Sequence, residues 1–276
     1  MKIKHIICLI TFSCFILHGF GQKKIVILHT NDTHSRIEPL PATDKRYPNR
    51  GGVVNRKAII DSIRNVEKSV LLVDIGDFVQ GTPYFNLFHG QVETGAMNMM
   101  NYDVGTLGNH EFDYGLDTLQ KIINYLNYPI INCNYDFTNT LLNGLVQPYL
   151  ILNKDGIKIG LIGVGCDPDG LIQKDKYEGM LFKPINETAN YYADFLKKKE
   201  KCDVIICLTH IGFDYDKRLA SSSQNIDLII GGHSHTYLEA PVRVKNSNDK
   251  DVIIYQVGKN GVFIGKTEIY LDKIKK

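Results

Sequence analysis

The feature that most constrains this fold is a series of short apolar runs, several of which end directly in a polar cluster. Runs of this length, bounded by glycine and polar residues, are typical of β-strands buried in a sheet. The predicted strands are Lys24–Leu28, Val70–Ile75, Tyr102–Leu107, Pro129–Cys133, Ile157–Val164, Val204–Leu208, Ile226–Ile230, Val252–Val257 and Val262–Leu271.

Apolar residues at helical spacing lie between several of these strands. The predicted helices are Val53–Val66, Gly115–Leu126 and Glu187–Lys199. Strands that alternate with helices indicate an α/β fold around a buried, largely parallel sheet. The later strands follow one another more closely, which indicates an antiparallel portion. There, Asn153–Gly156 predicts a hairpin turn that joins Tyr149–Leu152 to Ile157–Val164.

The composition is that of a compact protein. The chain has 276 residues, 43% of them hydrophobic, with 32 Lys and Arg against 30 Asp and Glu. These values exclude a disordered chain and a protein that coats nucleic acid. The length suits one domain of roughly 250 residues or two small ones. Because no linker or repeat interrupts Gln22–Lys276, we expect one domain over residues 22–276.

Residues 1–21 differ in kind from the rest. A basic start precedes an apolar run over 6–20, and Gly19 and Gly21 occupy positions −3 and −1 ahead of Gln22. This layout predicts a cleavable signal peptide, and hence a secreted or periplasmic protein, because the run is short for a membrane span. An uncleaved anchor is the alternative; a lipoprotein is disfavoured, because Thr11 is a poor residue three positions before Cys14. Cleavage would remove two lysines and leave a formal net charge of zero, so we expect no nucleic-acid partner and no membrane span.

The cysteines beyond residue 21 form no C-x-x-C pair. They are Cys133, Cys166, Cys202 and Cys207. An oxidising compartment permits disulfides, but this spacing does not require one. We expect four small buried thiols.

Polar clusters follow five of the predicted strands. They are Asn31, Asp32 and His34; Asp74 and Asp77; Asn109, His110, Glu111 and Asp113; His210; and His233 with His235. In open α/β sheets, ligands bind outside the carboxyl ends of the strands, so we expect these clusters to converge there. Five of the seven histidines beyond residue 21 lie in them, whereas His29, at a strand end, is expected to be a core or edge residue.

The residue types in these clusters indicate metal binding. Imidazole, carboxylate and amide oxygen without thiolate form a ligand set for Zn, Mn, Fe, Co or Ni. There are too many such residues for one ion, which indicates two. Asp32 and Asp77 would leave a residual charge of about +2 beside two divalent ions, which suits a phosphate dianion or an attacking hydroxide.

At this point the sequence resembles a known family. The motifs that carry the resemblance are His29–His34 (HTNDTH), Gly76–Pro83 (GDFVQGTP), Gly108–Gly115 (GNHEFDYG), Leu208–Gly212 (LTHIG) and Gly231–Thr236 (GGHSHT). They are similar to those of the 5′-nucleotidase branch of the calcineurin-like metallophosphatases, and they occur in the same order. The resemblance implies a four-layer α/β/β/α sandwich, with two mixed β-sheets flanked by helices and a dinuclear metal centre.

The resemblance also implies roles for individual residues. The first ion would be held by Asp32, His34, Asp77 and His235. The second would be held by Asp77, Asn109, His210 and His233, with Asp77 bridging the two. The metals implied are two divalent ions, of which Zn, Mn, Co, Fe and Mg remain open.

A catalytic pair is implied as well. It maps onto His110 and Asp113, with His110 placed to stabilise charge on the transferring phosphoryl group and Asp113 placed to orient the imidazole. Glu111 lies inside the same motif but is not a family ligand, so we expect it to be structural.

The activity implied is that of an exported phosphomonoesterase, with nucleoside 5′-monophosphates as expected substrates. A 2′,3′-cyclic nucleotide phosphodiesterase or a UDP-sugar pyrophosphatase is the alternative, because the same pair of ions handles diesters. A non-enzymatic metal-binding subunit is a further alternative, which the presence of both His110 and Asp113 argues against.

The family's second, C-terminal domain, which holds the nucleoside, has no counterpart before Lys276. The metal and phosphate chemistry carries over, whereas the nucleoside pocket does not. We therefore expect a separately encoded, nucleotide-binding partner that docks over Asn109–Asp113 and His233–His235. A self-sufficient phosphatase for small phosphoesters is the alternative.

Overall fold

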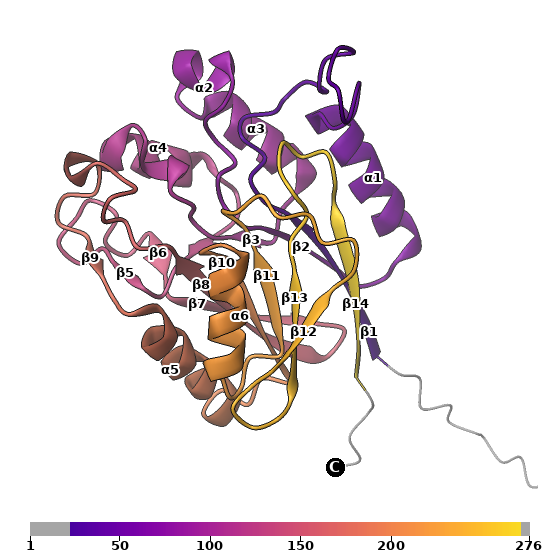
Figure 1. The fold of residues 1–276 in the computed structure, drawn as a ribbon, viewed down its shortest axis with the longest axis vertical. Helices are drawn as coiled ribbons and strands as arrows, with labels where there is room; N and C mark the ends of the chain where they lie inside the picture. Colours follow the sequence, from indigo (N-terminus) through magenta and orange to yellow (C-terminus); the bar gives the residue numbers. More distant parts are fainter. Residues whose placement is uncertain (1–22, 272–276) are drawn as a thin grey trace, which may run out of the picture.

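Two mixed six-stranded sheets form the centre of the structure, a computed structural model that describes residues 23–271 (Figure 1). The first sheet has the order β14-β1-β2-β3-β4-β6. Its strands are β1 (Lys23–Thr30), β2 (Val70–Asp74), β3 (Val104–Gly105), β4 (Ile130–Ile131), β6 (Val146–Gln147) and β14 (Gly265–Leu271). The second sheet has the order β12-β13-β11-β10-β8-β7. Its strands are β7 (Tyr149–Lys154), β8 (Ile157–Gly165), β10 (Val204–His210), β11 (Leu228–Gly231), β12 (Val242–Lys245) and β13 (Asp251–Tyr255).

Helices flank the pair of sheets (Figure 1). Those that connect strands of the first sheet are α1 (Val53–Val66), α2 (Pro83–Phe88), α3 (Gln91–Met100) and α4 (Gly115–Tyr125). Those that connect strands of the second sheet are α5 (Ile185–Lys198) and α6 (Phe213–Ser222). Two 3₁₀ turns, η1 (His110–Phe112) and η2 (Lys174–Lys176), and a small ribbon of β5 (Tyr135–Asp136) and β9 (Leu181–Phe182) complete the described elements.

The alternation of side chains along each strand produces the layers. Ile25 and Ile27 of β1 belong to an apolar cluster that also contains Leu161 of β8, so this cluster fills the space between the two sheets. Val26 and Leu28 point the other way and pack in the cluster that includes residues of α1, α3 and α4. A third cluster joins β8 and β10 to α5 and α6. The predicted four-layer sandwich is confirmed.

Most predicted elements are present, with markedly shorter strands at three places, one of which is Pro129–Cys133, a strand only at β4. The helix over Val53–Val66 has the predicted bounds. The predicted strand Tyr102–Leu107 is a strand only at β3, although Thr106 still donates from its amide to the carbonyl of Asp74 in β2 and from its hydroxyl to that of Ile131 in β4. The run from Val262 becomes a strand only at β14, because the Val262 amide closes a turn onto Lys259. The sequence did not predict α2, α3 and α6.

The hairpin and the cysteines follow the predictions. Strands β7 and β8 pair antiparallel, and the two loop residues Asp155 and Gly156 have φ angles of 52° and 70°, as a tight hairpin turn requires. Cys133, Cys166, Cys202 and Cys207 are all free and buried. The predicted signal peptide lies outside the described residues. Within 23–271, the structure contains no helix with both the length and the apolarity needed to span a bilayer.

Candidate metal centre

The polar strand ends of both sheets meet at one edge of the molecule. Asp32 and His34 follow β1, Asp77 follows β2 and Asn109 follows β3; from the other sheet come His210, the last residue of β10, and His233 and His235 after β11. The five strand ends converge as expected, and they belong to two sheets. They converge because β1, β2 and β3 lie in one sheet and β10 and β11 in the other, and the two sheets stack with their carboxyl ends together.

Backbone contacts hold the ligand loops in register. The amide of Asp32 donates to the carbonyl of Gly76 at 3.0 Å, and the amide of His34 donates to that of Asp77 at 2.9 Å. The loop after β3 approaches so closely that a Cβ at Gly108 would lie 2.2 Å from Asp77 Oδ1. Only glycine fits there, so this position sets how near the third loop comes to the carboxylate.

The backbone at the site is unusual. Asp32, His34, Asp77, His233 and His235 all have left-handed φ angles, between 48° and 75°. Non-glycine residues in this region cost free energy, on the order of 1–3 kcal/mol each, and such residues concentrate at functional sites. The left-handed turns point five ligand-type side chains toward a common centre.

The side chains form two adjoining donor groups. Asp32, His34 and His235 place their ligand atoms within 4.8 Å of one another, and so do Asp77, His210 and His233. Asn109 joins the second group, because its Oδ1 lies 2.9 Å from His233 Nδ1. Asp77 also forms a cluster with His34 and His110, which places its carboxylate between the two groups. The seven predicted ligand residues thus lie together, and the assignment of each to one of two ions stays a prediction.

The chemistry of His210 tests whether a cation fits. Its Nδ1–H donates to the carbonyl of Ile75 at 2.7 Å, so the ring, when neutral, presents a lone pair at Nε2. That buried Nε2 has no hydrogen-bond partner and lies 3.1 Å from Asp77 Oδ2, which is also an acceptor. Burial acts to lower the pKa of His210, but the charge of Asp77 raises it well above its usual value, so without a metal ion a proton on Nε2 can supply the positive charge between these two atoms. A metal ion can take the place of that proton, so these residues fit a cation.

The group of Asp32, His34 and His235 also brings potential ligand atoms close together. His34 Nε2 lies 2.9 Å from His235 Nε2, and His235 Nε2 lies 3.4 Å from Asp32 Oδ1. Burial lowers the pKa of His34 to about 4, and burial together with the charge of His210 lowers the pKa of His233 to about 4. Both imidazoles are therefore neutral at pH 7 and available as ligands.

His110 and Asp113 lie beside the two donor groups, and His110 also forms a group with His34 and Asp77. His110 Nδ1 is 3.0 Å from Asp113 Oδ2, and their side chains are 30% and 36% exposed. Burial acts to lower the pKa of His110, but the hydrogen bond that its imidazole donates to Asp113 and the charge of Asp77 outweigh burial and raise the pKa. The pair can therefore present a protonated imidazole to an anionic substrate.

Glu111 has the structural position that the sequence predicted. Its buried carboxylate accepts hydrogen bonds from the amides of Gly108 at 2.6 Å, Asp77 at 2.9 Å and Phe78 at 3.0 Å. These bonds tie the loop after β3 to the loop after β2.

The sequence did not assign a role to two further polar residues that support the site. Asn31 donates to Asp32 and to the carbonyl of Gly258, and Gln256 donates to the carbonyl of Gly232 while it accepts from the amide of Thr236. Asn31 lies inside one of the predicted polar clusters. For Gln256, the only signal in the sequence is a single polar residue within an apolar run.

Comparison with known proteins gives the same class of site. A family model of calcineurin-like phosphoesterases matches residues 25–237. A snake venom 5′-nucleotidase of Crotalus adamanteus is 30% identical over 272 residues, which cover 91% of this chain and 46% of that protein. The structure of a 5′-nucleotidase precursor from Thermus thermophilus superposes with a TM-score of 0.84 at 30% identity, over 90% of this chain and 51% of that chain. The calcineurin-like phosphoesterase YfkN of Bacillus subtilis superposes with a TM-score of 0.75 at 27% identity, over 92% of this chain and 87% of that chain.

The sandwich and its edge of histidines and aspartates define a metallophosphoesterase domain. The chain belongs to the calcineurin-like phosphoesterases and, within them, to the metal-dependent phosphoesterases of the 5′-nucleotidase family. It spans about half the length of the curated 5′-nucleotidase that it matches.

Proposed function

We propose that this chain hydrolyses phosphomonoesters, with nucleoside 5′-monophosphates as the first substrates to test. The observation that carries the proposal is the placement of the His110–Asp113 pair next to two adjoining donor groups that share Asp77. The 5′-nucleotidases among the relatives support the choice of substrate.

The residues have separate tasks in this proposal. Asp32, His34, Asp77 and His235 would hold one divalent ion, and Asp77, Asn109, His210 and His233 the other. Two ions bound there would neutralise phosphate charge and lower the pKa of a water molecule. His110, oriented by Asp113, donates a hydrogen bond to the phosphoryl group as charge moves to the leaving oxygen.

A test compares phosphate release from AMP by the protein with and without a chelator, and by the Asp77→Asn and His110→Ala variants. Chelation and both substitutions should remove most of the activity. Activity that neither substitution reduces would refute the assignment of these residues.

A second activity is supported by one comparison. YfkN, 29% identical to this chain, is described as a trifunctional nucleotide phosphoesterase. We therefore keep 2′,3′-cyclic nucleotides and UDP-sugars as second candidates, since a pair of ions handles diesters as well. A panel of AMP, 2′,3′-cyclic AMP and a UDP-sugar ranks them by kcat/KM.

Export and a partner belong to the same proposal. The sequence pattern over 1–21 supports secretion or a periplasmic location, which detection of the protein in a cell fraction would test.

The catalytic edge is open, with His235 and Asp113 about one third exposed, which supports a separately encoded nucleotide-binding partner over this face. Such a partner should lower the KM for AMP; an unchanged KM would refute it.

A further inference from the structure

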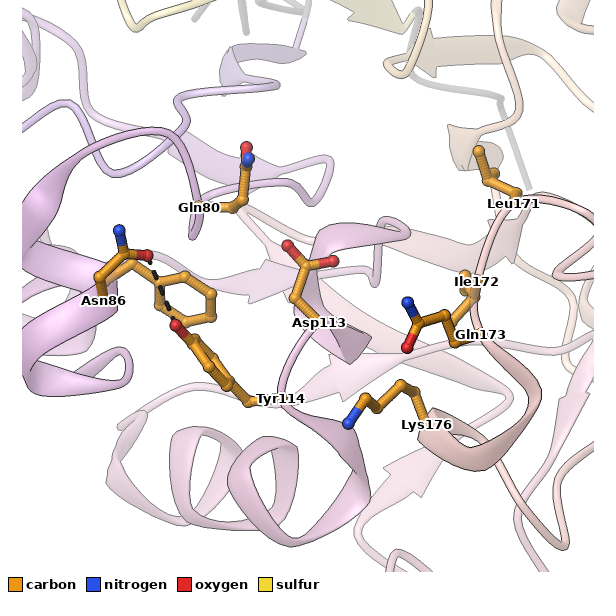
Figure 2. A pocket seen from close by; sticks show the side chains of 9 residues that line it. Gln80, Asn86, Asp113, Tyr114, Leu171, Ile172, Gln173 and Lys176 are labelled. Carbon is orange, nitrogen blue, oxygen red and sulfur yellow. Dashed lines mark hydrogen bonds between the residues drawn. The ribbon is translucent and has the colours of Figure 1, made fainter.

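A cavity of about 390 Å³ lies beside Asp113 of the catalytic pair. Figure 2 shows Asn86 of α2 on one side of Asp113, Gln173 and Lys176 at η2 on the other, and Gln80 above Asp113 in this view. None of the seven ligand-type residues lines it. The chemistry described above for the metal centre therefore does not use this space.

The catalytic pair connects the cavity to the reaction centre. The rings of His110 and His34 have centroids 5.5 Å apart, and Nδ1 of His110 is 3.0 Å from Asp113, whose side chain lines the cavity. The order is thus metal ligands, His110, Asp113 and cavity. A group attached to the leaving oxygen of a phosphate bound at the metal centre can extend into this space.

The residues that line the cavity favour a ligand that forms hydrogen bonds over a ligand that carries a charge. Gln80, Asn86 and Gln173 present carboxamides, which both donate and accept, and the hydroxyl of Tyr114 donates weakly to Asn86 Oδ1 at 3.4 Å. The charged side chains among the lining residues are those of Asp113 and Lys176, whose charges are opposite. A second phosphate would meet the Asp113 carboxylate, and an alkyl chain would leave the amides without partners.

The size of the cavity further limits which ligand can bind there. Its volume lies at the lower end of the roughly 300–1,000 Å³ that small-molecule sites span. Phe85 and Ile172 supply a buried apolar floor against which the carbon face of a ring can lie, while the amides reach its hydroxyls. A single sugar ring satisfies these features.

We propose that this cavity is a leaving-group subsite that binds the hydroxyls of a sugar whose phosphate is hydrolysed at the metal centre. The proposal rests on the phosphomonoesterase function above. Asn86 and Gln173 bind the sugar from opposite walls, and the ammonium group of Lys176 donates to a hydroxyl oxygen.

The test compares ribose 5-phosphate with ethyl phosphate, which lacks the hydroxyls, in the metal-loaded protein. The wild type should prefer ribose 5-phosphate by kcat/KM. Gln173→Ala and Asn86→Ala should each reduce that preference about tenfold, the effect of losing one hydrogen bond. Lys174→Ala is the matched control, because Lys174 lies on η2 next to Gln173, outside the cavity lining, with its side chain 86% exposed.

The outcomes separate the two proposals. An unchanged preference in both cavity variants, or an equal loss in the Lys174→Ala control, would overturn the subsite. Hydrolysis of neither compound by the wild type would count against the phosphomonoesterase function instead. Calorimetric binding of ribose 5-phosphate still decides the subsite in that case: weaker binding by Gln173→Ala than by wild type supports it, and equal binding overturns it.

Discussion

Replacement of Glu111 by glutamine tests how the metal loops are held. The glutamate accepts three backbone amides, two at Oε2 and one at Oε1. Glutamine offers one acceptor oxygen, so an NH₂ group must face at least one of these buried amides. The loss of a bond to a charged acceptor costs about 1.5–3 kcal/mol, and the two remaining bonds weaken because the acceptor is neutral. We expect Glu111→Gln to lower the free energy of unfolding by about 3 kcal/mol.

The assay is urea unfolding of the metal-free protein, so that loss of metal affinity does not contribute. Glu239→Gln is the matched control, because Glu239 is exposed. Burial, together with the charge of Asp77, raises the pKa of Glu111 to about 8, whereas three amide donors favour the carboxylate. If Glu111→Gln changes the free energy of unfolding by less than about 0.5 kcal/mol, the folded protein holds Glu111 in its neutral, protonated form. That result would refute the argument that a charged carboxylate holds the three amides.

The other predictions concern single side chains at the site and one distant control. His110→Ala should retain two bound metals, measured by elemental analysis, while kcat falls by roughly 10²–10³, the usual loss of one transition-state donor. An emptied metal site would contradict the role given to His110. His235→Ala should instead weaken one metal site in a calorimetric titration, and equal affinity at both sites would contradict its assignment. Gly108→Ala should abolish metal binding, because the new Cβ would lie 2.2 Å from Asp77 Oδ1. Gly95→Ala in α3, where nothing lies within 4 Å of the new Cβ, should stabilise the protein by roughly 0.5–1 kcal/mol in urea unfolding.

Much of the fold could be predicted because the burial of one face of a helix or strand produces a periodic pattern of apolar residues in the local sequence. The Val53–Val66 helix and the Asn153–Gly156 turn depend on periodicity and on φ angles within a few residues. The polar clusters could be placed at strand ends for the same reason, since each follows an apolar run directly. The family motifs then supplied the roles of individual residues, which spacing alone would not have given.

The short strands were harder to predict. The run Tyr102–Leu107 is as apolar as a full strand, yet only two of its residues, Val104 and Gly105, belong to the strand. An apolar run indicates that its residues are buried, but it does not indicate which backbone carbonyls will accept hydrogen bonds from their amides.

The sequence by itself determined which residues are candidates for the chemistry and at which strand ends they lie. Only the tertiary structure decided that these ends come from two stacked sheets, that His34 and His235 meet across 201 positions, and that a polar cavity opens beside Asp113. The physical reason is that the periodicity of apolar residues indicates the structure of one helix or strand at a time. Distances between elements depend instead on how the apolar faces of the two sheets pack, and that packing is a property of the whole chain.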